Sequence, residues 1–226
     1  VRAGHRKACR MFCLLHPERF DGHSPHKPFK LRGIRISFYG YYYPSRYNAL
    51  LNDEQKAFCH SIYQFKQGDI HGIEFFKTCM NALQLKKRPY HIMFMPCSNW
   101  IKYGQRFKRL DWYIGKHRQD LTSGLYDVDI CDARESLHEA KGGEKRILER
   151  NYLITGKIKG KEIIIIDDVL TTGQSVVDYK EEIERCGGKV VAAIFYGKTL
   201  SMPSMLLVQI HVWGNHIAHI IERMTK

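Results

Sequence analysis

One stretch decides the fold of this 226-residue chain: Ile163-Ile164-Ile165-Ile166-Asp167-Asp168-Val169-Leu170-Thr171-Thr172-Gly173-Gln174-Ser175. Its four consecutive isoleucines are typical of a central strand buried on both faces, because such a strand has no solvent-facing side. Two adjacent acids end this strand, a Thr-Thr-Gly turn follows, and a helical pattern begins at Ser175. We therefore predict an α/β fold with a mostly parallel sheet flanked by helices, and a site at its carboxyl edge.

The turn that follows the acids is suited to holding a phosphate. The backbone amides from Thr171 to Ser175 would meet the positive end of the following helix, and the hydroxyl groups there add donors. Gly173 allows a tight turn and a close approach to an anion. Asp167 and Asp168 would repel that anion, but adjacent carboxylates can accept hydrogen bonds from a vicinal diol such as that of ribose. The stretch thus predicts a site for a ribose 5-phosphate group.

The order of residues in this stretch resembles the signature with which type I phosphoribosyltransferases bind 5-phosphoribosyl 1-pyrophosphate (PRPP). That signature is a hydrophobic strand, two acids, two hydrophobic residues and Thr-Thr-Gly. The resemblance implies that Asp167 and Asp168 hold the ribose hydroxyls. It also implies a substrate-binding stretch whose last five residues cradle the 5′-phosphate: Val169, Leu170, Thr171, Thr172, Gly173, Gln174 and Ser175.

A second loop is expected at the same edge of the sheet. Pro96, Cys97 and Ser98 follow a predicted buried strand, His91 to Met95. By the same resemblance this loop binds the pyrophosphate through backbone amides. The sequence alone leaves open a plain turn between a strand and a helix.

The chain also resembles the competence protein F (ComF) family of phosphoribosyltransferase domains. A basic helix, a strand, an arginine-bearing loop and Glu149-Arg150-Asn151 precede the acid motif in that family's order. The family's N-terminal paired-cysteine zinc ribbon is absent here, and most of its Arg-Gly-Phe-Asn-Gln signature is lost. The resemblance implies that Arg150 acts with Asp167 and Asp168 in catalysis, by neutralising pyrophosphate when the loop closes. Further candidates for that role are Arg134, Lys141 and Arg146.

The resemblance implies a reaction in which a nitrogen base displaces pyrophosphate from the anomeric carbon of ribose. Mg²⁺ is the expected cofactor, because it bridges pyrophosphate and ribose oxygens while keeping several waters and few protein ligands. We therefore assign no residue as a metal ligand. The base itself has no readable signature in the chain.

The charge of the chain suggests a second function. Lysine and arginine number 36 against 23 acidic residues, a net charge of +13, and such an excess usually signals a polyanionic partner. Lys102, Arg106 and Arg109 fall on one face of a helix predicted from Trp100 to Arg118. The alternative is a catalytically weak or inactive domain that binds a nucleotide or nucleic acid in DNA uptake, DNA repair, regulation or defence. A homo-oligomer or a protein partner stays open.

Composition bounds the remaining organisation. We expect a basic, His-rich extension over residues 1–45 and one phosphoribosyltransferase-like domain over 46–226. The cysteines and histidines of the extension lack the C-x-x-C spacing of structural zinc sites, so no metal is assigned to them. Seven scattered cysteines favour reduced thiols in a cytoplasmic protein. No signal peptide is visible, and no apolar run approaches the ~20 residues that span a membrane.

Periodicity predicts the other elements of the domain. Strands are expected at 33–43, 91–95, 125–130, 189–196 and 206–213. Helices are expected from Asp53 to Gly68, through Ile73 to Leu83, from Trp100 to Arg118, from Ser175 to Cys186 and from Asn215 to Met224.

Overall fold

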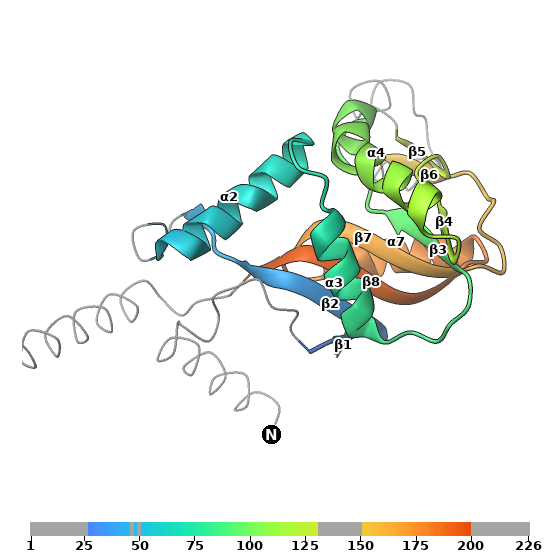
Figure 1. Cartoon of the computed structure of the whole chain (residues 1–226). Coiled ribbons are helices and arrows are strands. Elements are labelled where there is room, and N and C mark those ends of the chain that lie inside the picture. The colour runs from blue at the N-terminus through green and yellow to red at the C-terminus, as the bar shows by residue number, and fades with distance from the viewer. Residues whose placement is uncertain (1–26, 46–47, 49–50, 131–150, 200–226) are drawn as a thin grey trace, which may run out of the picture.

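The computed structural model describes residues 27–45, 48, 51–130 and 151–199 (Figure 1). Its helices are α2 (Asp53–Gln67), α3 (Ile73–Leu83), α4 (Trp100–His117) and α7 (Gln174–Arg185). Its strands are β1 (Phe29–Leu31), β2 (Ile34–Tyr42), β3 (Tyr90–Phe94), β4 (Leu121–Ser123), β5 (Val128–Ile130), β6 (Tyr152–Ile154), β7 (Glu162–Leu170) and β8 (Lys189–Thr199).

Six of these strands form one sheet, in the order β1-β2-β8-β7-β3-β4. Only β1 runs antiparallel to its neighbour, and the other pairings are parallel. The isoleucine strand β7 lies between β8 and β3, as its unbroken apolar run predicts. The predicted α/β class with a mostly parallel sheet is confirmed. A separate antiparallel pair is formed by β5 and β6.

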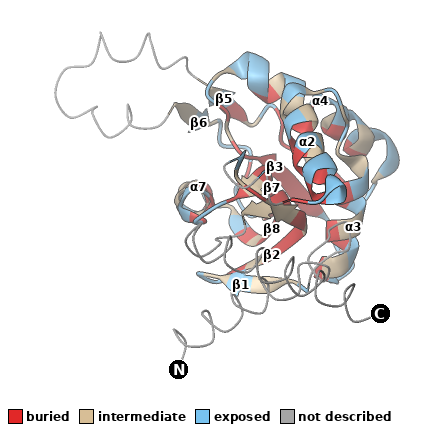
Figure 2. Ribbon diagram, turned by 90° about the vertical axis from the view of Figure 1, so that its left-hand side faces the viewer, coloured by how far each residue is buried: buried red, intermediate tan, exposed pale blue. Residues whose placement is uncertain are grey.

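The sheet has a hydrophobic layer on each face, and β7 contributes to both. Ile164 and Ile166 pack in the layer that contains the buried residues of α2, α3 and α4. Ile163 and Ile165 pack on the other side with the buried residues of α7. Figure 2 shows this arrangement, with buried strands between exposed helix surfaces. Helices on both faces explain why β7 needs no polar side.

Local signals explain where the helices begin and end. α2 starts with a capping box, in which the Gln55 amide donates to Asn52 Oδ1 at 2.8 Å and the Asn52 amide donates to Gln55 Oε1 at 3.0 Å. It ends at Gly68, whose φ of 81° favours glycine. A Cβ at Gly68 would lie 2.5 Å from the carbonyl oxygen of Gln105, so this glycine also allows α2 to approach α4.

Most predicted elements of the described residues are found within a few residues of their expected ends. The single strand expected at 125–130 is wrong in part: β5 covers only Val128–Ile130, and the short β4 precedes it. β1 and β2 belong to the main sheet, so the sheet reaches into the stretch 1–45 that the sequence set apart. The strand and helix expected at 206–224, and the N-terminal cysteines and histidines, lie outside the described residues.

Two expectations from composition can be compared with the described residues. None of their helices is both long enough and apolar enough to cross a membrane. Their four cysteines, Cys59, Cys79, Cys97 and Cys186, are free thiols.

Candidate functional site

The two acids of the motif lie in the last half of β7, at the centre of the sheet. The strand does not end at Asp167 and Asp168, as the sequence suggested. It continues to Leu170, which still pairs with Lys198 of β8. The acids are therefore fixed by backbone pairing, and the turn to α7 begins only after them.

Two cations lie against the acids. Arg106 Nη1 of α4 is 2.7 Å from Asp168 Oδ2 and 3.8 Å from Asp167 Oδ1. Lys66 Nζ, in the last turn of α2, is 3.5 Å from Asp168 Oδ2. The Arg106 side chain is only 15% exposed, so its ion pair with Asp168 is poorly screened by water. A diol that binds Asp168 must therefore share this carboxylate with the guanidinium or displace it.

Asp167 is the acid whose ionisation is most altered. Burial raises its pKa well above the ordinary value of 3.8, and the charge of Asp168 raises it further. The amide of Asp168, which donates to Asp167 Oδ1 at 2.7 Å, and the two cations oppose this rise. The pair therefore holds a proton more readily than two isolated carboxylates would. A pair with one proton can both donate to and accept from hydroxyl groups.

The turn from Thr171 to Gly173 leads directly into α7, whose first residue is Gln174. Gly173 has a φ of 82°, and a Cβ there would lie 2.3 Å from Cδ2 of Leu31 on β1. The positive φ therefore favours glycine here, and any larger residue would also require the Leu31 side chain to move. The hydroxyl-bearing residues Thr171, Thr172 and Ser175 are exposed. The first amides of a helix have no partner within the helix, so this end of α7 is suited to an anion.

Arg32 is a residue near this turn that the sequence did not reveal. It lies between β1 and β2, and its Nη1 donates to Gln174 Oε1 at 2.9 Å. The contact joins residues 142 positions apart, which no local pattern can signal. It brings a guanidinium to the start of α7, beside the predicted phosphate turn.

The loop Pro96–Ser98 lies at the same edge of the sheet as the acids. The Met95 amide donates to the Ile166 carbonyl oxygen at 2.9 Å, so β3 and β7 stay side by side up to this loop. Asn151 Nδ2 donates to the Cys97 carbonyl oxygen at 2.7 Å and ties the loop to the chain just before β6. Burial raises the pKa of the Cys97 thiol to about 11, so it is neutral near pH 7 and unsuited to act as a nucleophile.

The structure brings together the acids, the turn and the Pro96–Ser98 loop, but not every predicted residue can be placed. Arg150 lies outside the described residues, and so do Arg134, Lys141 and Arg146. The role of Arg150 stays a prediction. Its neighbour Asn151 is described, and its bond to the Cys97 carbonyl brings that part of the chain to the site.

The three cations predicted to share one face of α4 lie in two different environments. Lys102 and Arg109 are exposed, and Arg109 Nη1 contacts His71 Nε2 at 2.7 Å. Arg106 between them is instead paired with the acids. No adjacent residue singles out Arg106, because the exposed Lys102, Lys108 and Arg109 also adjoin buried side chains. Once the fold is known, the pairing is expected, since arginine is rarely buried unless a carboxylate pairs with it.

The site was also compared with what a magnesium ion requires. Within the described ranges, no three His, Cys, Asp or Glu side chains form a group that could hold a metal ion. Mg²⁺ in phosphate-binding sites takes one or two carboxylates and completes its shell with substrate oxygens and water. Two carboxylates beside an anion-binding turn therefore fit an ion that arrives largely bound to its substrate.

Residues 119–199 match the family model of the phosphoribosyl transferase domain. This range contains β7, α7 and β8, and with them the acids and the turn, but not the Pro96–Ser98 loop. The match therefore covers the part of the chain that carries the motif, and it supports the phosphoribosyltransferase resemblance at a coarse level. The resemblance to the competence protein F family stays a prediction.

Two known proteins are similar to part of the chain. An orotate phosphoribosyltransferase of Sulfolobus acidocaldarius is 42% identical over 57 residues, which are 25% of this chain and 26% of that protein. The transcriptional regulator GfcR 1 of Methanosarcina barkeri is 30% identical over 63 residues, which are 28% of this chain and 29% of that protein. The chain thus spans between a quarter and a third of each relative's length.

Proposed function

We propose that the chain binds PRPP with Mg²⁺ at the carboxyl edge of the sheet and transfers its phosphoribosyl group to a nitrogen base, releasing pyrophosphate. The observation that carries this proposal is the acid pair on β7, followed at once by a glycine turn and a helix N-terminus. The family match over residues 119–199 includes all of these parts.

Each part of the site has a chemical role in this proposal. Asp167 and Asp168 accept hydrogen bonds from the ribose hydroxyls, and the amides and hydroxyls of Thr171–Ser175 hold the 5′-phosphate. The amides of Pro96–Ser98 hold the pyrophosphate. Arg150 neutralises part of its charge. The two loops that bind anions flank the acids, as a substrate with a phosphate at each end requires.

In the reaction, a base nitrogen forms a bond to the anomeric carbon while the bond from that carbon to pyrophosphate breaks. Both electrons of the broken bond leave with the pyrophosphate. Positive charge develops on the sugar ring, and carboxylates in a poorly solvated site stabilise it. When bound with the substrate near Asp167 and Asp168, Mg²⁺ would supply positive charge to offset that of the leaving pyrophosphate.

Calorimetric titration with PRPP and Mg²⁺ tests the site. We expect Asp168→Asn to weaken PRPP binding by about tenfold to a hundredfold, because hydrogen bonds to a charged group contribute about 1.5–3 kcal/mol. Asp120→Asn is the matched control, since it removes an exposed carboxylate just before β4, at the opposite edge of the sheet. No PRPP binding by the folded native chain, or equal loss in both variants, would contradict the proposal.

A second candidate function is regulation through nucleic-acid binding, in a protein whose phosphoribosyl transfer is weak or lost. The relative named as a transcriptional regulator favours it, and so does the net charge of +13. Such a protein could act in DNA uptake, repair, regulation or defence, with a protein partner or a second copy of itself. Binding of DNA that weakens steeply with salt supports this candidate, because each neutralised duplex phosphate adds about 0.9 to the log–log slope.

A further inference from the structure

The exposed surface of α4, together with the turn before β5, carries aromatic rings and cations. Trp100 is 40% exposed, Trp112 is 57% exposed, and Tyr126, in the turn before β5, is 66% exposed. Cations lie among them at Lys108, Arg109 and Lys116. We call these six residues, five on the exposed surface of α4 and Tyr126 beside it, the outer face of α4. Large aromatic side chains normally bury most of their surface, so three exposed rings among cations need a reason.

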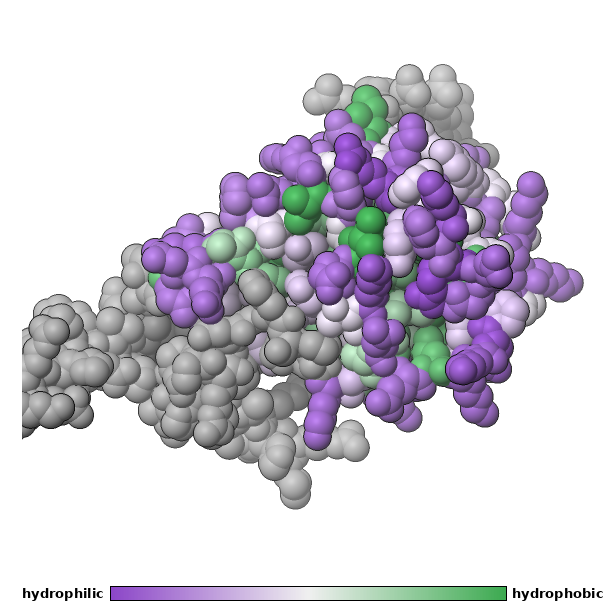
Figure 3. All heavy atoms as spheres, viewed as in Figure 1, coloured by the Kyte–Doolittle hydropathy of each residue, from purple (hydrophilic) through white to green (hydrophobic). Residues whose placement is uncertain are grey.

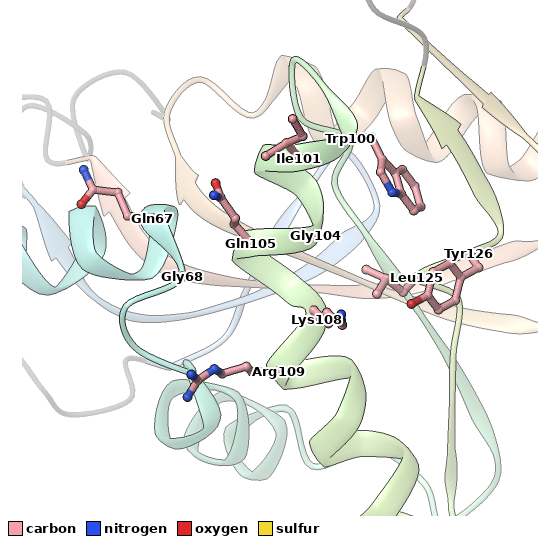
Figure 4. Close-up of a pocket in the computed structure, with 10 residues that line it drawn as sticks. All are labelled: Gln67, Gly68, Trp100, Ile101, Gly104, Gln105, Lys108, Arg109, Leu125 and Tyr126. Carbon is pink, nitrogen blue, oxygen red and sulfur yellow. The ribbon is translucent and has the colours of Figure 1, made fainter.

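Part of the outer face lines a pocket of about 470 Å³. In Figure 4, Trp100 and Tyr126 lie on one side of α4, and Arg109 lies on the other side, near the end of α2. Lys108 projects from the helix between them. The centroids of the Trp100 and Tyr126 rings are 6.1 Å apart, at an interplanar angle of 42°. The two rings lie next to each other, and the exposed part of each ring is accessible to a flat ligand.

The outer face continues along the helix beyond this pocket. Trp112 follows Lys108 by one turn, and Lys116 follows Trp112 by another, so the three lie along one side of α4. Lys116 Nζ is 4.9 Å from the centroid of the Trp112 ring. At 1.5 Å per residue, Trp100 and Trp112 are about 18 Å apart along the helix. A separation of 12 residues also places the two rings about a third of a turn apart around α4, so the rings and cations form a path that winds along the helix and is longer than a single small ligand.

We infer that the outer face of α4 binds single-stranded nucleic acid, with its rings stacking on unpaired bases and its cations contacting phosphates. Alternation of flat rings with cations suits this ligand, because every base has a face that can stack and every nucleotide carries a charge. A duplex would offer the phosphates but not the base faces. On the side shown in Figure 3, hydrophobic residues form small patches separated by hydrophilic ones, which favours a charged ligand over an apolar partner.

This surface is distinct from the proposed PRPP site. Arg106 points from α4 to Asp168, whereas the outer-face residues of α4 are exposed to solvent. The inference gives the second candidate function a surface and a ligand class, and it rests on that candidate. It does not require PRPP binding, so the two sites can be tested separately.

Fluorescence anisotropy with a labelled oligothymidylate tests the inference on the full chain. A matched probe carries the same phosphates on abasic sugars, so the difference between the two probes reports stacking. We expect the native chain to bind the oligothymidylate about tenfold or more tightly than the abasic probe. Trp112→Leu should remove most of that difference, and Trp112→Tyr, which keeps a ring, should retain it.

The cations are tested by salt dependence. Lys108→Gln combined with Arg109→Gln should lower the log–log salt slope by about 1.4, because each phosphate contact on a single strand contributes about 0.7. Lys157→Gln combined with Lys159→Gln is the matched control, since it removes two exposed charges elsewhere in the chain and should leave the slope almost unchanged.

The possible negative results distinguish failure of this inference from failure of the second candidate function. Oligothymidylate binding that is equal to abasic binding, or that survives Trp112→Leu with its full advantage, overturns the inference but leaves general nucleic-acid binding in place. Tight binding to duplex DNA without binding to the single strand also overturns the inference and leaves general nucleic-acid binding in place. No binding to any of these probes overturns both the inference and the second candidate function. Calorimetry with PRPP reports on the first proposed function in either case.

Discussion

The two sides of α4 both carry positively charged side chains, but one of these is largely buried and paired with an acid, whereas the other is exposed to solvent. Arg106, on the side toward the sheet, is largely buried and lies 2.7 Å from Asp168. Lys108, two residues later, is exposed on the outer face. The local sequence, Gln-Arg-Phe-Lys-Arg, gives little warning of this difference. What a cation on this helix can do depends on whether an acid-bearing strand lies below it.

The comparison also limits what net charge can indicate. A charge of +13 counts Arg106 equally with Lys108, although Arg106 is already neutralised by the acids of β7. Charge that is paired inside the fold is not available to a polyanion. The nucleic-acid hypothesis therefore depends on the exposed outer face. The PRPP hypothesis depends on how readily Arg106 releases the Asp168 carboxylate to the substrate.

Among the substitutions that test this comparison, Arg106→Leu is expected to have the largest effect on stability. Removing one partner of a largely buried ion pair leaves Asp168 poorly compensated, so we expect the free energy of unfolding to fall by about 2–3 kcal/mol. Lys108→Leu, the matched change on the outer face, should alter it by only about 0.5 kcal/mol. Urea denaturation measures both. Equal losses in the two variants would show that the two sides of the helix do not differ as described.

A second effect concerns pH. Because the folded state raises the pKa of Asp167, it binds a proton that the unfolded chain releases above 3.8. The stability contributed by this proton is present at low pH and is lost as the pH rises toward the folded-state pKa. Asp167→Asn cannot titrate, so the variant should lose this slope, which is at most about 1.4 kcal/mol per pH unit. Urea denaturation across mildly acidic and neutral pH measures it, and an unchanged slope in the variant would contradict the assignment.

The smallest effect is expected at the loop that precedes α4, where the Asn151 side chain donates a hydrogen bond to the Cys97 carbonyl oxygen. Asn151→Ala should cost about 1 kcal/mol of stability, the contribution of a typical hydrogen bond. It should also weaken PRPP binding by a few fold, because the Pro96–Ser98 loop loses a support, while oligothymidylate binding stays the same. Asn81→Ala, an exposed asparagine on α3, is the control. Weaker oligothymidylate binding in Asn151→Ala would mean that the two sites are not independent.

The sequence predicted the elements whose signals are local. The isoleucine run of β7 indicated a strand buried on both faces, and the helix expected from Asp53 to Gly68 matches α2 to within one residue. The acids, the turn and the Pro96–Ser98 loop could be placed at one edge because parallel strands end together. These predictions needed only periodicity, capping and the rule of strand direction.

Features that depend on distant contacts could not be predicted in this way. Arg106 and Asp168 are far apart in the chain, as are Arg32 and Gln174, and only the fold brings each pair together. The strand β4 was missed because three residues with one buried side chain have no periodicity. The extension of β7 through the acids was missed because strand pairing with β8 outweighs the low strand preference of aspartate.

The sheet order has a consequence for the behaviour of the chain at high concentration. In the described part of the chain, the six-stranded sheet ends in β1 on one side and β4 on the other, and each has three residues. Long, flat edge strands offer unpaired backbone groups to other chains and promote aggregation, whereas short ones offer little to pair with. The long isoleucine strand, which would be hazardous at an edge, is enclosed between two neighbours. The same arrangement that centres the acids thus keeps the isoleucine strand away from edge-to-edge association.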